Sequence, residues 1–246
     1  MASSSKSLSG YDRDMAADRA RTPDHLSPRG LLVVAEGLDG SGKSATLDGL
    51  ARWLERRGRD VRTIAWEPSE LVARAAADPR SRTALTPRVA ALLAAADAQH
   101  RIGARVGRRL AAGDVVLADR YAWTAIAREV ARGLDLDWSG DLHRSLPAPD
   151  IVLYHRGDAG SAFERALAMR PASVRSAAVG AAYGTFVERL LGAFDALAER
   201  ARDGLGTPWT TRVVELDVGA DPVVNARIAR DAVRPLVEAG GSGRAA

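Results

Sequence analysis

Short apolar runs along the chain alternate with longer stretches in which apolar residues recur at helical spacing. The run at 31–35 is apolar throughout, which is typical of a strand buried on both faces. In the next stretch, Leu47, Leu50 and Leu54 recur at helical spacing and predict a helix. The predicted strands cover 31–35, 61–66, 115–118, 151–155 and 212–216, and the predicted helices cover 45–57, 69–77, 87–112, 123–132, 159–169, 182–203 and 223–239. This alternation favours an α/β fold with a doubly wound, five-stranded parallel sheet and helices on both faces.

The two ends of the chain differ in composition from the part between them. Residues 1–28 are rich in Ser, Asp and Arg and contain Pro23 and Pro28 near their end, so we interpret them as a disordered tail. Residues 240–246 are interpreted as a second, short flexible tail. Residues 29–239 then form one predicted domain, whose ligands should bind beyond the carboxyl ends of the strands.

Composition excludes several classes of protein. Apolar residues make up 46% of the 246 residues, which is enough for a core, and the absence of cysteine excludes disulfides and thiolate metal sites. No apolar run is long enough to span a membrane and the N-terminus has no signal-peptide core, so we expect a soluble cytoplasmic protein. The net charge of +4 comes from interleaved acidic and basic residues. No basic-aromatic motif accompanies it, so we expect no nucleic-acid partner.

Lysine is almost absent from this arginine-rich chain. Of 35 basic residues, 33 are arginine, and Lys43 is the only lysine outside the N-terminal tail. It lies in the segment 37–44, which fits the phosphate-binding pattern G-x-x-x-x-G-K-[ST] between a predicted strand and a predicted helix. A compact ammonium can follow β- and γ-phosphates, and the hydroxyl of Ser44 can bind Mg²⁺. The alternative, a chance glycine-rich turn, is disfavoured by the flanking elements. The predicted phosphate-binding residues are Gly37, Asp39, Gly40, Ser41, Gly42, Lys43, Ser44 and Ala45.

Charged residues follow two further predicted strands. Asp119 and Arg120 come directly after 115–118, where a carboxylate can hold Mg²⁺ and an arginine can bind a phosphate. The alternative is a capping Asp with a surface Arg at a helix start. Glu67 follows 61–66, and it fits the wall of an acceptor pocket and an ordinary helix start equally well.

Three arginines lie in or after the predicted helix 159–169. Arg165, Arg170 and Arg175 surround Pro171 in a segment of small and polar residues, which is typical of a mobile flap that closes over a transferring phosphoryl group. We expect Arg170 and Arg175 to be the catalytic ones. The alternative for each is a solvated helix face. The four histidines, His25, His100, His143 and His155, show no ligand spacing and are expected to be non-catalytic.

Taken together, these motifs resemble the thymidylate kinase family of P-loop nucleoside monophosphate kinases over most of residues 31–237. The segment 36–44 is similar to the family's phosphate loop, and Glu67 with Pro68 matches its acidic-Pro pair. Residues 119–127 follow the family's D-R-Y-x-x-S-x-x-A pattern, with Thr124 for Ser. The resemblance implies that Asp39 meets the acceptor, that Arg120 orients its phosphate and that ATP with Mg²⁺ is the donor.

The chain departs from the family pattern on the acceptor side. Ala94 stands where the family has the Phe that stacks on thymine, and Ala98 stands where it has an Arg. Arg128 and Glu129 replace a Tyr-Gln pair, and His155 with Arg156 replaces the Leu-Asp at the end of the fourth strand. The residues expected to bind the acceptor are Asp39, Glu67, Ala94, Ala98, Arg120, Thr124 and Arg128.

The resemblance implies an ATP-dependent phosphotransferase that acts on a small-molecule acceptor, dTMP or a related nucleotide. Its catalytic residues would be Lys43, Arg120, Arg170 and Arg175, and Ser44 and Asp119 would hold the metal. The rebuilt acceptor side leaves two alternatives: a kinase for a modified nucleotide or a non-nucleotide metabolite, and an ATP-binding switch without transfer activity. Family members often form homodimers, so the resemblance also implies a possible homodimer.

Overall fold

The computed structural model describes residues 30–66, 69–77, 85–158, 160, 161, 164, 177–203 and 211–239. Within these residues, five parallel strands form one sheet in the order β2-β3-β1-β4-β5, which confirms the predicted fold class. The strands are β1 (Leu31–Gly37), β2 (Val61–Ala65), β3 (Val115–Asp119), β4 (Ile151–Arg156) and β5 (Arg212–Asp217). The connection after β1 runs to β2 on one side of the sheet, and the connection after β3 crosses to β4 on the other, so the carboxyl ends of β1 and β3 form a topological switch point where ligands bind.

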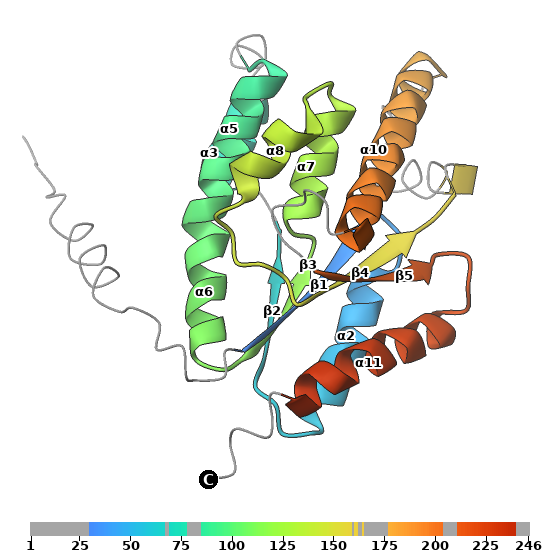
Figure 1. Ribbon diagram of the computed structural model, residues 1–246. Coiled ribbons are helices and arrows are strands. Elements are labelled where there is room, and N and C mark those ends of the chain that lie inside the picture. The colour runs from blue at the N-terminus through green and yellow to red at the C-terminus, as the bar shows by residue number, and fades with distance from the viewer. Residues whose placement is uncertain are drawn as a thin grey trace, which may run out of the picture.

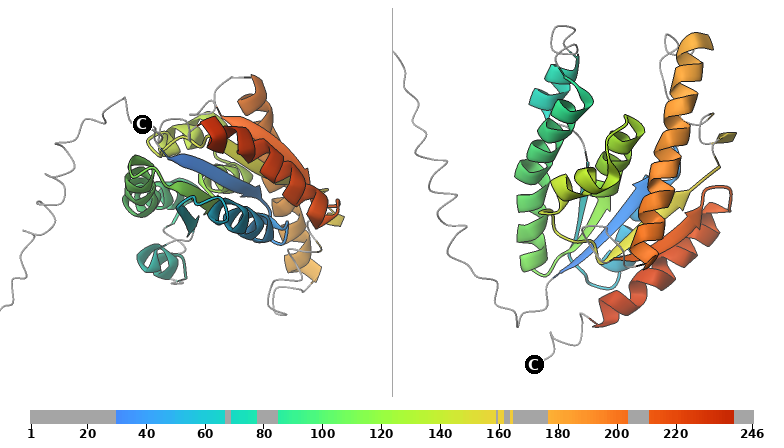
Figure 2. Two further views of the ribbon diagram at one scale, coloured as in Figure 1. Left: turned by 90° about the horizontal axis from the view of Figure 1, so that it is seen from below. Right: turned by 45° about the horizontal axis from the view of Figure 1, so that its top comes forward.

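Helices cover both faces of this sheet (Figures 1 and 2). The alternation of side chains along β1 separates two cores. Val33 and Ala35 pack with the helices α2 and α11, whereas Leu32 and Val34 face the side covered by α6, α7 and α10. The helices are α2 (Lys43–Glu55), α3 (Glu70–Ala77), α5 (Pro87–Ala98), α6 (Ala104–Ala111), α7 (Ala122–Ala131), α8 (Leu136–His143), α10 (Ala177–Asp203) and α11 (Pro222–Ala239).

The helix predicted over 87–112 is present from Pro87 to Ala111, but it is not α-helical throughout. A π-helical turn, η1 (Gln99–Gly103), separates α5 from α6. Such a turn inserts an extra residue and shifts the helix faces on either side of it, which periodicity alone does not reveal. Gly103 leaves room for the side chain of Gln99, because a Cβ at this glycine would lie 3.2 Å from the Gln99 amide nitrogen.

The prediction from sequence also missed α8 and placed the ends of several helices at other residues. Helix α8 is short and contains Gly140, so its periodicity is weak. The start of α8 does carry a signal in the sequence, because Asp is a common N-cap residue. In the structure, the side chain of Asp135 accepts from the Trp138 N–H at 2.9 Å. Helix α10 begins at Ala177 rather than at the predicted 182, and α2 begins at Lys43 rather than at 45. Most of the predicted helix 159–169 lies outside the described residues, as do the predicted tails 1–28 and 240–246.

An ion-pair network joins β4 and β5 to α10. Arg156, at the end of β4, holds the carboxylate of Asp195 through Nε at 3.0 Å and Nη2 at 3.2 Å. The hydroxyl of Tyr154 donates to the same carboxylate at 2.9 Å, and Glu215 of β5 pairs with Arg156 at 3.5 Å.

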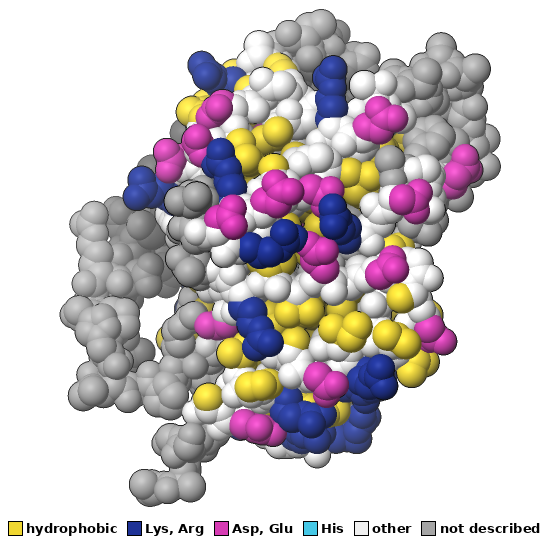
Figure 3. Space-filling model, turned by 45° about the vertical axis from the view of Figure 1, so that its right-hand side comes forward, with side chains coloured by type: hydrophobic (Ala, Val, Ile, Leu, Met, Phe, Trp, Pro, Cys, Tyr) yellow, Lys and Arg dark blue, Asp and Glu magenta, His cyan; other side chains and the backbone are white. Residues whose placement is uncertain are grey.

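On the face shown in Figure 3, basic and acidic side chains are interspersed. Of the helices that the structure describes, none is long and apolar enough to cross a membrane.

Candidate active site at the phosphate loop

The loop between β1 and α2 presents backbone groups at the carboxyl edge of the sheet. Three of its glycines have positive φ, with 136° at Gly37, 74° at Gly40 and 89° at Gly42. A Cβ at Gly37 would lie 2.6 Å from the carbonyl oxygen of His155, so no side chain fits there. Gly42 is the N-cap of α2, and its carbonyl accepts from the Thr46 N–H at 3.0 Å. The free amides at this helix start are suited to phosphate oxygens.

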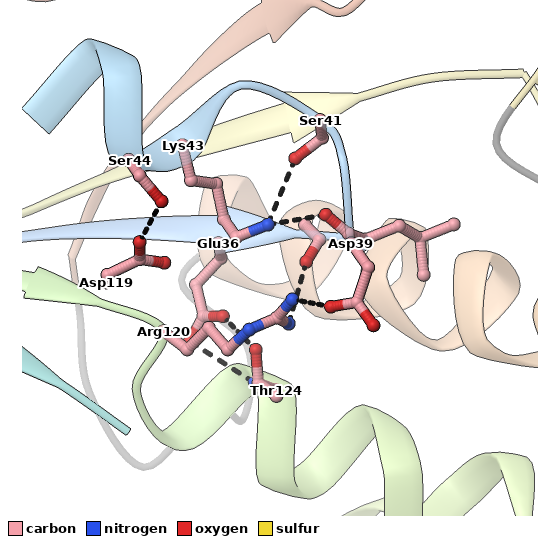
Figure 4. Close-up of polar contacts among 10 residues, drawn as sticks. Glu36, Asp39, Ser41, Lys43, Ser44, Asp119, Arg120 and Thr124 are labelled. Atoms are coloured by element: carbon pink, nitrogen blue, oxygen red, sulfur yellow. Dashed lines mark hydrogen bonds and ion pairs between the residues drawn. The ribbon is translucent and has the colours of Figure 1, made fainter. Parts of the chain in front are cut away.

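Lys43 lies within this loop and is only 4% exposed. Its ammonium donates to the carbonyl of Leu38 and, at 3.2 Å, to the hydroxyl of Ser41 (Figure 4). The pKa of Lys43 is lowered from 10.5 to about 8, chiefly by burial and next by the Arg120 cation, against the attraction of nearby carboxylates. A charge that has already lost most of its water is well placed to interact strongly with phosphate.

Ser44 and Asp119 provide two adjacent oxygen ligands. The Ser44 hydroxyl donates to the Asp119 carboxylate at 2.5 Å, which joins the first turn of α2 to the end of β3. A hydroxyl and a carboxylate are hard donors, and Mg²⁺ takes one or two such protein ligands together with substrate phosphates and water. The pair therefore fits the metal that the sequence predicts at Ser44 and Asp119.

Arg120 turns back from the end of β3 toward the phosphate loop. Its φ of 68° is the only positive value at a non-glycine residue among those described, a conformation that costs free energy and is concentrated at functional sites. The guanidinium donates to the Gly37 carbonyl at 3.2 Å and forms an ion pair with Asp39. The cation predicted to bind the acceptor phosphate thus lies against the carboxylate predicted to meet the acceptor (Figure 4).

Glu36 is a site residue to which the sequence analysis gave no role. It is fully buried, and its carboxylate accepts from the N–H groups of Tyr121 at 2.9 Å and Thr124 at 3.2 Å, and from the Thr124 hydroxyl at 2.5 Å. Burial raises its pKa, and the hydrogen bonds from Thr124 and the Arg120 cation oppose the rise. Glu36 thereby ties β1 to the start of α7. A charged residue within an otherwise apolar strand was the signal that could have revealed it.

One cleft of about 460 Å³ is bordered by Asp39, Lys43, Ser44, Asp119 and Arg120. Its described lining includes most of the predicted phosphate-binding residues, and Trp66 forms part of the wall. The Trp66 ring meets Tyr121 edge-on at 5.9 Å and His143 at 6.0 Å between centroids. His143 is in turn held by Glu129 at 3.0 Å, and both are buried. Trp66, held by these two ring contacts, is therefore the aromatic part of a cleft lining that also contains Lys43, Ser44 and Asp119.

Comparison with known proteins shows the family to which the chain belongs. A model described as thymidylate kinase matches residues 35–178, which is more than half of the chain. The chain belongs to the thymidylate kinase family. In this family the loop at 36–44 is the phosphate loop of a P-loop kinase, in agreement with its geometry here.

Curated relatives support this assignment at moderate identity. A probable thymidylate kinase 2 from Saccharolobus solfataricus is 37% identical over 137 residues, which cover 56% of this chain and 64% of the relative. A probable thymidylate kinase from Thermococcus kodakarensis is 36% identical over 132 residues, 50% of this chain and 64% of the relative. A thymidylate kinase from Xanthomonas oryzae pv. oryzae is 33% identical over 133 residues, 52% of this chain and 56% of the relative. The match therefore spans less than two thirds of the length of these relatives.

Two of the positions at which the chain departs from the family pattern, Ala94 and Ala98, do not line the phosphate cleft. Ala94 is half-buried on α5 and Ala98 is 3% exposed, and neither is among the described residues that line the cleft. Their neighbour Asp97 accepts from the Ser69 N–H at 2.8 Å, which links α5 to the segment before α3. Thr124 is buried and donates to Glu36, so it supports the site from within.

Arg128 lies one helical turn beyond Thr124 on the same face of α7. Burial lowers its pKa, the Arg120 cation lowers it further, and Asp39 and Glu36 oppose the shift. Its charge therefore lies close to the acceptor side of the site. Of the residues that the structure describes, none accepts a hydrogen bond from its guanidinium.

Several predicted site residues lie outside the described part of the chain. They are Glu67 of the predicted acceptor pocket and the arginines of the predicted flap, Arg165, Arg170 and Arg175. Conversely, His155 contacts the phosphate loop, a position that its spacing in the sequence did not indicate. Its Nδ1 lies 2.9 Å from the carbonyl oxygen of Ser41.

Proposed function

We propose that this chain transfers the γ-phosphate of ATP to a nucleoside monophosphate, with dTMP as the first candidate. The observation that carries the proposal is the arrangement around one cleft. Lys43 in the phosphate loop, the Ser44–Asp119 pair and the Arg120–Asp39 pair all border it. These are the groups that phosphoryl transfer needs on its donor, metal and acceptor sides.

The donor side follows from the loop. The amides at the start of α2 and the Lys43 ammonium hold the β- and γ-phosphates and stabilise the negative charge that develops during transfer. Ser44 and Asp119 would hold Mg²⁺, which neutralises phosphate charge when bound. Because an acceptor phosphate is already ionised, no general base is required, and catalysis is mostly positioning and electrostatics.

The acceptor side follows from two guanidinium groups. Arg120 is pre-positioned by Gly37 and Asp39, and Arg128 contributes a second positive charge close to it, for which the described residues provide no hydrogen-bond acceptor. Burial and the neighbouring Arg120 cation both act against the charge of Arg128, and an anionic phosphate bound between the two guanidinium groups would offset this repulsion. We assign to Arg170 and Arg175 the closing role that their sequence context predicts, and Glu67, Ala94 and Ala98 remain candidates for the acceptor pocket.

A coupled ADP-release assay over a panel of nucleoside monophosphates tests this proposal. The full chain with ATP and Mg²⁺ should release ADP only when an acceptor is present, and Lys43→Ala should abolish the signal. The proposal would be refuted if no nucleoside monophosphate in the panel increased the rate of ADP release above the rate without acceptor.

A second candidate acceptor class is favoured by the departures on α5 and α7. The chain places methyl groups at Ala94 and Ala98 and an extra cation at Arg128, which would suit a bulkier or more anionic acceptor than dTMP. Modified nucleotides and phosphorylated metabolites in the same panel distinguish this class. Saturable ATP binding with no transfer to any acceptor would instead support an ATP-binding switch.

We also propose a homodimer, as family resemblance implies. Helix α5 exposes three large apolar side chains, Val89 at 41%, Leu92 at 49% and Leu93 at 39%, which is the kind of patch that a second copy can bury. Sedimentation equilibrium tests it. A monomer at all concentrations would exclude the dimer, and Leu92→Arg should dissociate a dimer that uses this face.

A further inference from the structure

His155 lies directly beneath the phosphate loop and is 2% exposed. It is paired in register with Gly37, at the carboxyl end of β4. Its Nδ1 lies 2.9 Å from the Ser41 carbonyl oxygen, and a Cβ placed on Gly42 would lie 4.0 Å from the same nitrogen, so the ring lies at contact distance from the loop. The imidazole therefore supports the loop from the side opposite the cleft.

The hydrogen bond fixes the tautomer of His155. A carbonyl oxygen can only accept, so Nδ1 carries the proton and Nε2 carries the lone pair. Burial and the Lys43 cation lower the pKa of His155 from 6.5 to about 4, despite the hydrogen bond with Ser41, so the ring is neutral near pH 7. Its Nε2 is buried without a partner among the described residues, beside a small cavity of about 10 Å³ that Leu38 and Leu191 also line.

The geometry of the peptide bond transmits this contact to the ligand side. In a planar trans peptide, the carbonyl oxygen and the N–H of the next residue point in opposite directions. The Ser41 carbonyl is held toward β4 by His155, so the N–H of Gly42 is directed away from the sheet, toward the cleft. Donation to the carbonyl also polarises the peptide unit and strengthens its N–H as a donor.

We propose that His155 is a positioning residue for ATP: its Nδ1–H fixes the Ser41–Gly42 peptide so that the Gly42 N–H is pre-organised to bind a donor phosphate. The inference rests on the proposed function only for ATP as the ligand of the loop. It is independent of the acceptor. Without His155 the Ser41 carbonyl loses this hydrogen bond and the Gly42 N–H is no longer pre-organised, so ATP affinity should fall on the order of tenfold.

A pair of amide variants separates this hydrogen bond from general packing. In His155→Asn the side-chain nitrogen has the reach of Nδ1, whereas in His155→Gln it extends one bond further, toward the position of Nε2. Both variants bury an amide and carry a similar cost in stability. The affinity for ATP, measured by calorimetry with Mg²⁺, should be nearly unchanged in His155→Asn and about tenfold weaker in His155→Gln and His155→Leu.

Tyr154→Phe is the matched control. It alters the neighbouring residue of β4, whose side chain lies on the opposite face of the strand, and removes a hydrogen bond to Asp195 of α10. It should lower the melting temperature and leave ATP affinity unchanged. In the His155 variants that transfer phosphate, the KM for ATP should rise while the KM for the acceptor stays constant.

Two results would overturn the inference. One is ATP affinity in His155→Leu equal to that of the wild type, and the other is equal loss in the Asn and Gln variants. If the Leu variant does not fold, the Asn–Gln comparison decides alone. Wild-type binding of ATP without transfer to any acceptor would refute the proposed function but not this inference, because the calorimetric comparison needs no acceptor.

Discussion

Replacing Arg128 by glutamine removes a half-buried cation for which the described residues provide no hydrogen-bond acceptor. In the unliganded protein, the Arg120 cation and burial both act against the charge of Arg128, as the direction of its pKa shift shows. If an acceptor phosphate binds between these cations, Arg128 gains a hydrogen bond to a charged group, which contributes about 1.5–3 kcal/mol. The loss of that interaction should raise the acceptor KM roughly 10- to 150-fold.

The same substitution should affect stability in the opposite direction. Removing one of two neighbouring desolvated cations relieves repulsion, so the free energy of unfolding of the unliganded Arg128→Gln variant should rise slightly, by about 1 kcal/mol at most. The assays are initial rates over a range of acceptor concentrations at saturating ATP, and urea unfolding without ligands. The KM for ATP should stay unchanged, because the donor loop is not altered.

Arg132→Gln provides the matched control, since Arg132 follows the last residue of α7. Its guanidinium lies 5.5 Å from the Phe186 ring, a cation–π contact. This variant should lose about 0.5–1 kcal/mol of stability and keep the acceptor KM. An unchanged acceptor KM in Arg128→Gln, or an equal rise in Arg132→Gln, would refute the assignment of Arg128 to the acceptor site.

Three further predictions concern the donor loop and its supports. Lys43→Ala should keep the fold but lower kcat by about 10²-fold or more, equivalent to about 2.7 kcal/mol, and kinetics at saturating ATP will show whether it does. Thr124→Val leaves the Glu36 carboxylate without its shortest hydrogen bond, so chemical unfolding should show a loss of about 1–3 kcal/mol; no loss would contradict the role of Glu36 as a tie between β1 and α7. His155 has a folded-state pKa below that of the unfolded chain, so the unfolded state binds more protons and wild-type stability should fall as pH drops from 6.5 toward 4. His155→Leu should lose less stability over that range, and parallel unfolding curves at each pH test this.

The arrangement of the sheet could be predicted because it depends on local patterns. The apolar run of β1 and the alternation of strands and helices are readable without knowledge of contacts. The phosphate loop could be recognised for the same reason. Gly37 and Gly42 supply the positive φ values that the turn requires, and Lys43 follows at the start of α2.

The partners of the supporting residues could not be predicted because these contacts join positions distant in sequence. His155 lies 114 residues from the carbonyl that it contacts, and Glu36 lies 88 residues from Thr124. No spacing rule links such pairs, since the pairing of β1 with β4 brings His155 to the loop and the pairing of β1 with β3 brings Glu36 to the start of α7. The π-helical turn at Gln99–Gly103 was missed because an inserted residue changes the phase of the helix without interrupting its apolar content.

The most direct test of the central claim follows the γ-phosphate itself. The full chain is incubated with γ-labelled ATP, Mg²⁺ and dTMP, and the products are separated by chromatography. The account predicts that label appears in a nucleoside diphosphate, dTDP or the diphosphate of a better acceptor offered in its place, and that Lys43→Ala produces none. Label that appears only in inorganic phosphate, or labelled diphosphate at equal rates in wild type and Lys43→Ala, would contradict it.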